Sequence, residues 1–146
     1  MIYTEMTKKA LRLMFDAQKE QVDKSGMPYV FHPFHLADQM TDEATTVVAL
    51  LHDVAEDTPY TIEDISAMGF SDEICDALRL MTHDKAVPYL DYVRKIKGNP
   101  IAMAVKIADL KHNSDLSRLD VVDDNVRERV KKYREALSIL IEDGAE

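Results

Sequence analysis

Apolar residues recur at intervals of three and four along most of this chain, which is the spacing of one face of an α-helix. The clearest case is the segment 5–22, in which Ala10, Leu11, Met14 and Phe15 share a face. No segment alternates apolar and polar residues in the two-residue period of a half-buried strand. The pattern therefore predicts an all-α fold.

Turn and capping residues divide this pattern into about seven or eight helices. Thr61, followed by Asp64, has the spacing of a capping box, and Ser71 is placed to cap the next helix. Gly and Pro residues mark the breaks between helices, because neither continues a helix well. The predicted helices cover residues 5–22, 29–40, 44–57, a short helix after Thr61 that ends at Gly69, and residues 71–81, 88–97, 101–113 and 124–141.

The length and composition are those of a globular protein. A chain of 146 residues fits one domain, so we expect a single helical bundle over residues 1–146. The first residues lack a basic segment followed by an apolar run, and no apolar run is long enough to span a membrane. Cys75 is the only cysteine, which excludes an intrachain disulfide. Together these features predict a cytoplasmic protein.

The charge of the chain limits its partners. The formal net charge is −9, whereas nucleic-acid binding requires a basic surface. We therefore expect neither a nucleic acid nor a membrane as a partner. A phosphorylated small molecule would have to be held locally, by a metal ion or a few cationic side chains, because the overall field repels it.

A cluster of titratable residues ends the most apolar helix. The run 47–51 leads directly into His52, Asp53, Glu56 and Asp57. Carboxylates near a helix C-terminus oppose the helix dipole, and Asp53 and Asp57 are a like-charge pair four residues apart. A divalent cation would make this unfavourable cluster stable. The sequence therefore predicts a metal site here.

Two residues in other helices are candidates for the remaining metal ligands. His32 stands at the start of one predicted helix, and Asp109 follows the apolar segment 101–108. A carboxylate at the end of so apolar a helix needs a partner, because an unpaired buried carboxylate is costly. With His52 and Asp53 these residues offer two imidazoles and two carboxylates. That set suits Mn²⁺, Fe²⁺ or another first-row divalent ion.

Three motifs that contain these residues resemble the hydrolase domain of the RelA/SpoT family, which is one branch of the HD-domain metal-dependent phosphohydrolases. The motifs are KSGMPYVFHP at 24–33, ALLHDVAEDT at 49–58, and VKIAD with the following His112 and Asn113 at 105–113. They occur in the family's order. The resemblance implies an HD-type helical bundle and a manganese-dependent enzyme of the stringent response. Such an enzyme removes the 3′-pyrophosphate from the alarmone guanosine tetra- or pentaphosphate, (p)ppGpp.

The resemblance also implies a role for each matched residue. By motif position, the metal ligands are His32, His52, Asp53 and Asp109, the catalytic acids are Glu56 and Asp57, and the nucleotide-site residues are Lys24, Ser25 and Asn113. Residue chemistry agrees for Glu56, which lies four residues after His52 and three after Asp53 and so shares their face. From there it can orient or deprotonate a metal-bound water. Either Glu56 or Asp57 can be the base.

The chain departs from the family pattern before the first motif and after the last. Gln18, Glu20 and Asp23 stand where the family usually has His, Gly and Arg, and Leu110 stands where an Arg is common. The family's Arg at the position of Asp23 stacks on guanine, whereas a carboxylate cannot stack in this way and repels phosphate. Two alternatives therefore stay open. One is a phosphatase or pyrophosphohydrolase for another nucleotide, and the other is a non-catalytic nucleotide- or metal-binding helical module.

Other titratable residues need no role in this chemistry. His35 and His83 lie outside the motifs, and we expect them on the surface. Lys106 falls within an apolar helix, and we expect it to extend its ammonium group to the surface rather than to contact a phosphate. His112 precedes Asn113 in the third motif, but it also stands near a helix C-terminus, where a partly charged imidazole is favourable.

Overall fold

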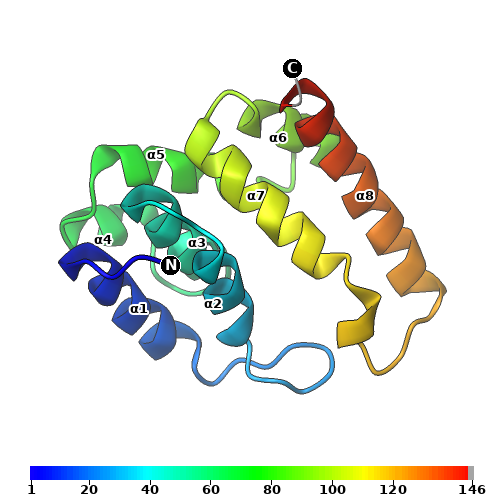
Figure 1. Cartoon of the computed structure of the whole chain (residues 1–146), viewed down its shortest axis with the longest axis horizontal. Coiled ribbons are helices and arrows are strands. Elements are labelled where there is room, and N and C mark those ends of the chain that lie inside the picture. Colours follow the sequence, from blue (N-terminus) through cyan, green and yellow to red (C-terminus); the bar gives the residue numbers. More distant parts are fainter. Residues whose placement is uncertain (145–146) are drawn as a thin grey trace.

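The computed structural model describes the backbone of residues 1–144 and the side chains of residues 1–141. Eight α-helices and one short 3-10 helix make up this part of the chain, without a β-strand (Figure 1). The elements are α1 (Glu5–Gln18), α2 (Phe31–Asp38), α3 (Glu43–Asp57), α4 (Ile62–Ala67), α5 (Asp72–Met81), α6 (Tyr89–Ile96), α7 (Pro100–Asn113), η1 (Leu116–Arg118) and α8 (Asp124–Gly144). The prediction of an all-α fold is confirmed.

Helix α3 is the centre of the bundle and packs against α1, α2, α5 and α7. Its residues from Thr45 to Val54 are buried without a break, which is the pattern of a helix surrounded on all sides. Asp42 caps its N-terminus, because Asp42 Oδ1 accepts a hydrogen bond from the backbone N–H of Thr45 at 2.8 Å. The residues in the last turns of α3 are therefore held by a rigid, fully packed helix.

Helices α2, α3 and α7 are in mutual contact, although they are far apart in the sequence. Helix α8 lies along the other side of α7 (Figure 1). The loop between α1 and α2 and the segment that contains η1 lie at the same end of the molecule. There Ser25 Oγ accepts a hydrogen bond from the backbone N–H of Asp120 at 3.1 Å. This arrangement brings the three predicted motifs to one end of the bundle.

The predicted helix starts and caps agree well with the structure. Thr61 Oγ1 accepts from the Asp64 N–H at 3.0 Å and Asp64 Oδ2 accepts from the Thr61 N–H at 2.9 Å, which confirms the capping box. Ser71 caps α5 through the N–H of Ile74 at 3.3 Å. The prediction that the first helix extends to residue 22 is wrong, because α1 ends at Gln18.

The chain after α1 leaves the helix to form a structured loop. Val22 makes an isolated antiparallel bridge with Pro28. Asp23 Oδ1 accepts hydrogen bonds from the backbone N–H groups of Ser25 and Met27, at 2.9 Å and 3.0 Å. Gly26 completes the turn with a φ of 79°, a conformation that favours glycine. Asp23 therefore organises this loop, a role that its sequence position did not indicate.

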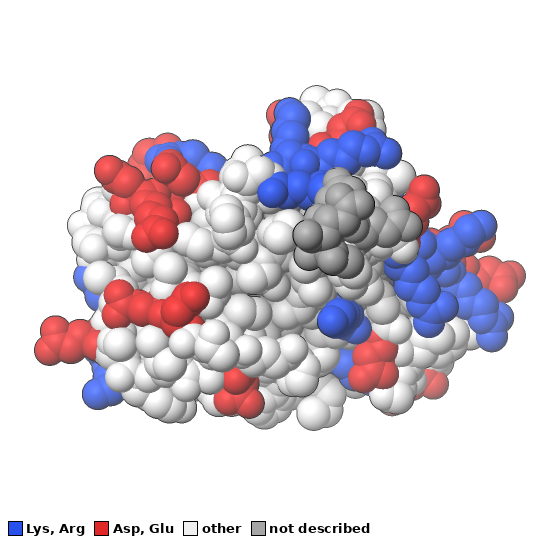
Figure 2. Space-filling view, turned by 45° about the horizontal axis from the view of Figure 1, so that its top comes forward, with Lys and Arg blue, Asp and Glu red and all other residues white. Residues whose placement is uncertain are grey.

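Charged side chains are distributed unevenly over the surface. In Figure 2 the Lys and Arg side chains gather toward the half of the visible face that carries α6 and α8, while Asp and Glu prevail on the other half. The basic residues of α8 include Arg127, Arg129, Lys131, Lys132 and Arg134. The net charge of −9 thus hides a locally basic region. Among the described helices, none has the length and apolar character that crossing a membrane requires.

Candidate metal centre

His32, His52 and Asp109 come from α2, α3 and α7 and meet in the interior of the bundle. Each offers one ligand atom, and these atoms all lie within 4.8 Å of one another. Asp109 Oδ1 is 2.9 Å from His32 Nε2 and 3.6 Å from His52 Nε2. All three side chains are buried. Two imidazoles and a carboxylate in this arrangement can hold a divalent metal ion.

The ring of His52 is oriented by a hydrogen bond outside this group. His52 Nδ1 donates to the backbone oxygen of Ala49 at 2.7 Å, since a carbonyl oxygen can only accept. In the neutral ring the lone pair then lies on Nε2, which is buried and has no hydrogen-bond partner among the described residues. A buried nitrogen without a partner is unfavourable. A bound metal ion would remove this cost.

The ring of His32 is oriented in a similar way by His112. Their Nδ1 atoms are 2.7 Å apart and the two rings are stacked. Burial and the nearby positive charge of Arg118 lower the pKa of His112 to about 3, so this imidazole is neutral near pH 7 and can accept at Nδ1. His32 can then donate from Nδ1 and present the lone pair of Nε2 to the cluster. Histidines that bind metals commonly donate their second N–H to such a partner.

Asp53 lies beside the triad and is held by Tyr29. Its Oδ2 atom is 3.2 Å from His52 Nε2 and 3.9 Å from His32 Nε2. The Tyr29 hydroxyl donates a hydrogen bond to the same oxygen. Burial and the negative charge of Asp53 raise the pKa of Tyr29, which keeps the phenol protonated as a donor. The structure therefore places the fourth predicted residue at the edge of the triad.

Asp109 is supported on both of its carboxylate oxygens. Oδ2 lies 3.1 Å from Lys106 Nζ, and Oδ1 accepts a hydrogen bond from Asn113 Nδ2 at 3.1 Å. Burial alone would raise the pKa of Asp109, but the charge of Lys106 and the two neighbouring imidazoles hold it well below the usual value. Asn113, predicted to line a nucleotide site, thus also positions a carboxylate of the triad.

The expectation that Lys106 reaches the surface is wrong. Its side chain is only 11% exposed. The ammonium nitrogen lies 5.8 Å from the ring centroid of Tyr89 and 5.3 Å from that of Tyr92, which are distances of cation–π contacts. Two aromatic faces and the Asp109 carboxylate replace the water that the ammonium group would otherwise bind.

Glu56 and Asp57 end α3 beside the cluster. Glu56 Oε1 accepts a hydrogen bond from the backbone N–H of His83 at 3.3 Å. The pKa of Glu56 is raised, mainly by burial and also by the charge of Asp53, although the His83 N–H acts in the opposite direction. Burial and Asp53 likewise raise the pKa of Asp57. Carboxyl groups with raised pKa values near a cluster of ligands are suited to proton transfer.

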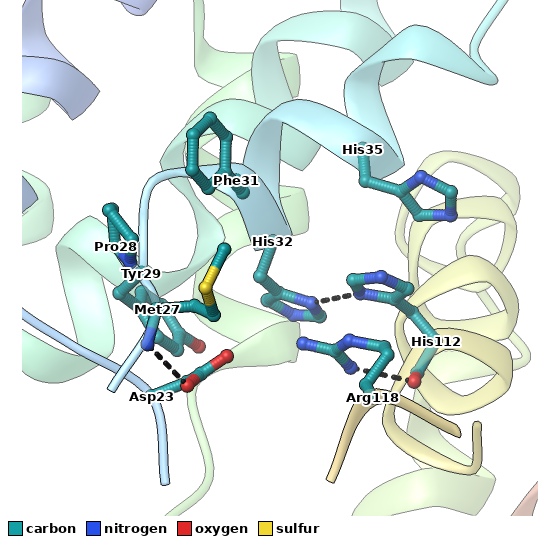
Figure 3. Close-up of a pocket in the computed structure, with 9 residues that line it drawn as sticks. All are labelled: Asp23, Met27, Pro28, Tyr29, Phe31, His32, His35, His112 and Arg118. Carbon is teal, nitrogen blue, oxygen red and sulfur yellow. Dashed lines mark hydrogen bonds between the residues drawn. The ribbon is translucent and has the colours of Figure 1, made fainter. Parts of the chain in front are cut away.

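A pocket of about 350 Å³ gives access to His32 (Figure 3). The His32 and His112 rings face each other inside it, and His35 stacks on His112 with ring centroids 4.1 Å apart. Met27 and Phe31, which are 53% and 57% exposed, form an apolar side. The lining residues are Asp23, Met27, Pro28, Tyr29, Phe31, His32, His35, His112 and Arg118. His35 lies on the surface as predicted, but as part of this wall.

A second pocket, of about 330 Å³, shares Asp23, Tyr29 and Arg118 with the first. Lys24 and Asn113 line this second pocket. Ser25 lines a third pocket, of about 370 Å³, together with Lys24. The residues matched to a nucleotide site therefore lie next to the pocket that contains His32 and not in it.

Four residues that support the site were not predicted to do so. Tyr29 and Lys106 lie within the sequence motifs. Their places in the motifs mark them as near the site, but the motifs alone do not indicate that they support the ligands. His112 also lies in a motif but was equally well explained as a helix end. Arg118 lies outside the motifs in η1, and no local pattern marks it.

Comparisons with known proteins point in one direction. No protein-family model matches the chain. Over 113 residues it is 34% identical to the guanosine-3′,5′-bis(diphosphate) 3′-pyrophosphohydrolase MESH1 of Mus musculus, a match that covers 69% of this chain and 63% of that protein. Over 113 residues it is 32% identical to the bifunctional (p)ppGpp synthase/hydrolase SpoT of Escherichia coli, covering 67% of this chain and 16% of SpoT. The chain thus spans a little under two thirds of MESH1.

A solved structure has a similar fold. It is described as "A metazoan ortholog of SpoT hydrolyzes ppGpp and plays a role in starvation responses", and it superposes with a TM-score of 0.76 at 24% sequence identity. The superposition covers 96% of this chain and 88% of the other. The helical arrangement is therefore shared over nearly the whole of both chains.

Proposed function

Because the chain carries an HD-type hydrolase domain of the RelA/SpoT-like family, we propose that it is a metal-dependent (p)ppGpp 3′-pyrophosphohydrolase. The relatives at 34% and 32% identity are named for this activity. The observation that carries the proposal is the buried, unpartnered Nε2 of His52 within a group of ligand atoms. The reaction consumes one water and converts guanosine tetraphosphate into GDP and pyrophosphate.

We assign the metal to His32, His52, Asp53 and Asp109, and propose manganese as the ion. The donor set of nitrogen and carboxylate oxygen atoms suits Mn²⁺ or Fe²⁺. The single thiol, Cys75, is buried in α5 and is not part of the site. We also propose a cytoplasmic location, which a chain with a single cysteine fits. When bound, the ion supplies a water of lowered pKa and polarises a phosphoryl oxygen.

The residues around the ligands have proposed roles of two kinds. Tyr29 orients Asp53, and Lys106 with Asn113 orients Asp109. Glu56 is the proposed proton-transfer group, because it shares a helix face with His52 and Asp53 and has a raised pKa. Asp57 is the alternative in that role, since burial and the charge of Asp53 raise its pKa as well.

Lys24, Ser25 and Asn113 are proposed to contact the nucleotide outside the scissile pyrophosphate. Two of them line the pocket that adjoins the His32 pocket, and Ser25 lines the next. We propose that a nucleotide with phosphates on both sides of its ribose occupies the two adjoining pockets, which share Asp23, Tyr29 and Arg118. Its cleaved end would then lie at the triad and its other end toward Lys24.

Hydrolysis by purified protein tests this proposal. Metal-depleted protein is reloaded with manganese and incubated with a panel of nucleotides that includes guanosine tetraphosphate, and we expect GDP and pyrophosphate as products. Asp109→Asn should abolish turnover, whereas the matched control Asp76→Asn, on the exposed side of α5, should not. No release of pyrophosphate or phosphate from any nucleotide would refute the enzymatic assignment.

A second candidate is an HD-type phosphatase or pyrophosphohydrolase for another nucleotide. It is favoured by Asp23, whose carboxylate lines the His32 pocket at the position where the resemblance leads one to expect an Arg. The same panel decides between the two, because this candidate requires that guanosine tetraphosphate stays intact while another nucleotide is hydrolysed. Metal binding without hydrolysis of any nucleotide would instead identify a non-catalytic module.

A further inference from the structure

Arg118 occupies a special place in the wall of the His32 pocket. It is the one Lys or Arg among the residues that line this pocket. A nitrogen of its guanidinium group donates to the backbone oxygen of His112 at 2.7 Å. Figure 3 shows that its other terminal nitrogen points into the space between Asp23 and His32. The side chain is half-buried, so its orientation is set by the fold.

The guanidinium group of Arg118 has more N–H donors than it uses in hydrogen bonds to the described residues. It carries five N–H groups in a planar fork, and one of its nitrogens is engaged by the His112 carbonyl. Arg118 forms no ion pair with any carboxylate of the described residues. Two acidic residues lie near it: Asp23 in the His32 pocket and Asp115 in the adjoining one. Oδ1 of Asp23 is already used by two backbone N–H groups of its own loop, and Oδ1 of Asp115 is used by Ser117. The free donors of Arg118 are therefore available to an anion in the pocket.

The position of Arg118 also joins two pockets. It lines both the His32 pocket and the adjoining pocket that contains Lys24 and Arg129. Arg118, Lys24 and Arg129 therefore line two adjoining pockets, the first of which contains His32. In a chain of net charge −9, these three cations supply the local positive charge that can hold a polyanion.

We infer that Arg118 binds a phosphate of the nucleotide substrate at the junction of the two pockets. This inference rests on the proposed function, because it assumes a phosphorylated nucleotide that reaches the triad. A guanidinium held at one nitrogen can present a forked pair of N–H donors to two oxygens of one phosphate. The backbone oxygen of His112 fixes the fork in place before the substrate arrives, which reduces the entropy lost on binding.

Kinetics of Arg118→Gln provide the first test. A contact made equally in the ground state and the transition state raises KM and leaves kcat nearly unchanged. Loss of a charge-assisted, bidentate contact should raise KM by on the order of tenfold or more. The matched control is Arg127→Gln, since Arg127 is 66% exposed on α8 and pairs only with Asp124 in the described structure. An unchanged KM in Arg118→Gln would overturn the inference.

Binding of inorganic pyrophosphate to the metal-loaded protein provides a second test that does not depend on turnover. Calorimetry should show weaker binding to Arg118→Gln than to wild type, with wild-type affinity in Arg127→Gln. If wild type hydrolyses no nucleotide, the proposed function fails, but this titration still decides the role of Arg118. Equal affinities of wild type and Arg118→Gln for pyrophosphate would show that the side chain does not bind phosphate.

Arg118→Lys keeps the experiment decisive if the Gln variant melts at a lower temperature through loss of its bond to the His112 carbonyl. Lys retains the charge and one donor but cannot form the planar fork. We therefore expect an affinity for pyrophosphate between those of wild type and Arg118→Gln. Full wild-type affinity in a folded Arg118→Lys variant would contradict a bidentate contact and overturn the inference.

Discussion

Lys106 Nζ lies 3.1 Å from Asp109 Oδ2, three residues away on α7, and both side chains are buried. Lys106 therefore occupies Oδ2 of Asp109, while the other carboxylate oxygen, Oδ1, faces His32 and His52. The aromatic rings of Tyr89 and Tyr92 enclose the ammonium group. The proposed metal ligand Asp109 is thus held in place by a buried ammonium group.

Replacing Lys106 by Met should destabilise the protein. Removing one partner of a buried ion pair leaves an uncompensated charge, which costs roughly 3–5 kcal/mol. Urea unfolding of the metal-depleted variant measures the loss, and the exposed residue Lys95 on α6 supplies the control, Lys95→Met. A Lys106→Met variant as stable as the control would show that the pair does not support the fold.

Metal should stabilise the folded chain. A ligand that binds only the native state adds about 2.7 kcal/mol when its concentration is a hundred times Kd. We therefore expect manganese to raise the melting temperature of wild type. His52→Ala should lose this effect, because it removes the buried Nε2 atom, whereas Ser117→Ala in η1 should retain it. A wild-type melting curve that does not move on adding manganese would speak against the metal site.

Tyr29→Phe should weaken metal binding without unfolding the protein. The hydroxyl donates to Asp53 Oδ2 from outside the ligand group, and loss of such a partner typically reduces metal affinity by about 10- to 100-fold. Titration of the apoprotein with manganese measures the change. Tyr3→Phe is the control, since Tyr3 is 64% exposed. Equal manganese affinities in the two variants would remove Tyr29 from the site.

Glu56→Gln should lower kcat and leave metal binding intact. General acid–base groups contribute about 10²- to 10⁴-fold to rate, and the amide cannot transfer the proton. Steady-state kinetics with manganese-loaded protein measure the effect, with Glu63→Gln on the exposed side of α4 as the control. A larger loss in Asp57→Asn than in Glu56→Gln would transfer the role to Asp57.

The free energy of unfolding should decrease at acidic pH in part through protonation of Asp42. Hydrogen bonds from the backbone and hydroxyl of Thr45 lower the pKa of Asp42 in the folded state. Its contribution is therefore complete above the unfolded pKa of about 4 and is lost as the pH falls through the lower folded pKa. Asp42→Ala should cost about 1 kcal/mol at neutral pH.

A comparison of wild type with Asp42→Asn isolates the effect of Asp42 protonation on stability. Asn caps a helix about as well as Asp but has no proton to gain. Urea unfolding at neutral pH and below about pH 4 should give a smaller loss of stability in Asp42→Asn than in wild type. Identical acid sensitivity of the two proteins would show that Asp42 does not contribute to it.

Local features of the sequence were enough to predict most of the helices. Capping hydrogen bonds join residues no more than four positions apart. Thr61 and Ser71 therefore predict the starts of α4 and α5 from the sequence alone. The end of α1 was predicted wrongly for the complementary reason. Val22 pairs with Pro28 across a turn that the side chain of Asp23 stabilises. The spacing of apolar residues along the chain does not predict these contacts.

The sequence by itself determined the class of fold and a set of candidate ligands, because helical periodicity and short motifs are properties of contiguous segments. The candidate ligands that follow from the sequence alone are His32, His52, Asp53 and Asp109. Only the tertiary structure decided which atoms of these residues face one another. His32 and Asp109 are separated by 77 residues, yet their polar atoms lie 2.9 Å apart.

The same distinction explains the residues that surround the ligands. The burial of Lys106 between two tyrosines and the place of Arg118 in the pocket wall depend on how α6, α7 and η1 pack on the rest of the bundle. Side-chain burial is set by neighbours that are distant in sequence, so no period or spacing along the chain encodes it. The candidate ligands could therefore be predicted from the sequence, whereas the residues that support them and the shape of the pocket depend on the fold.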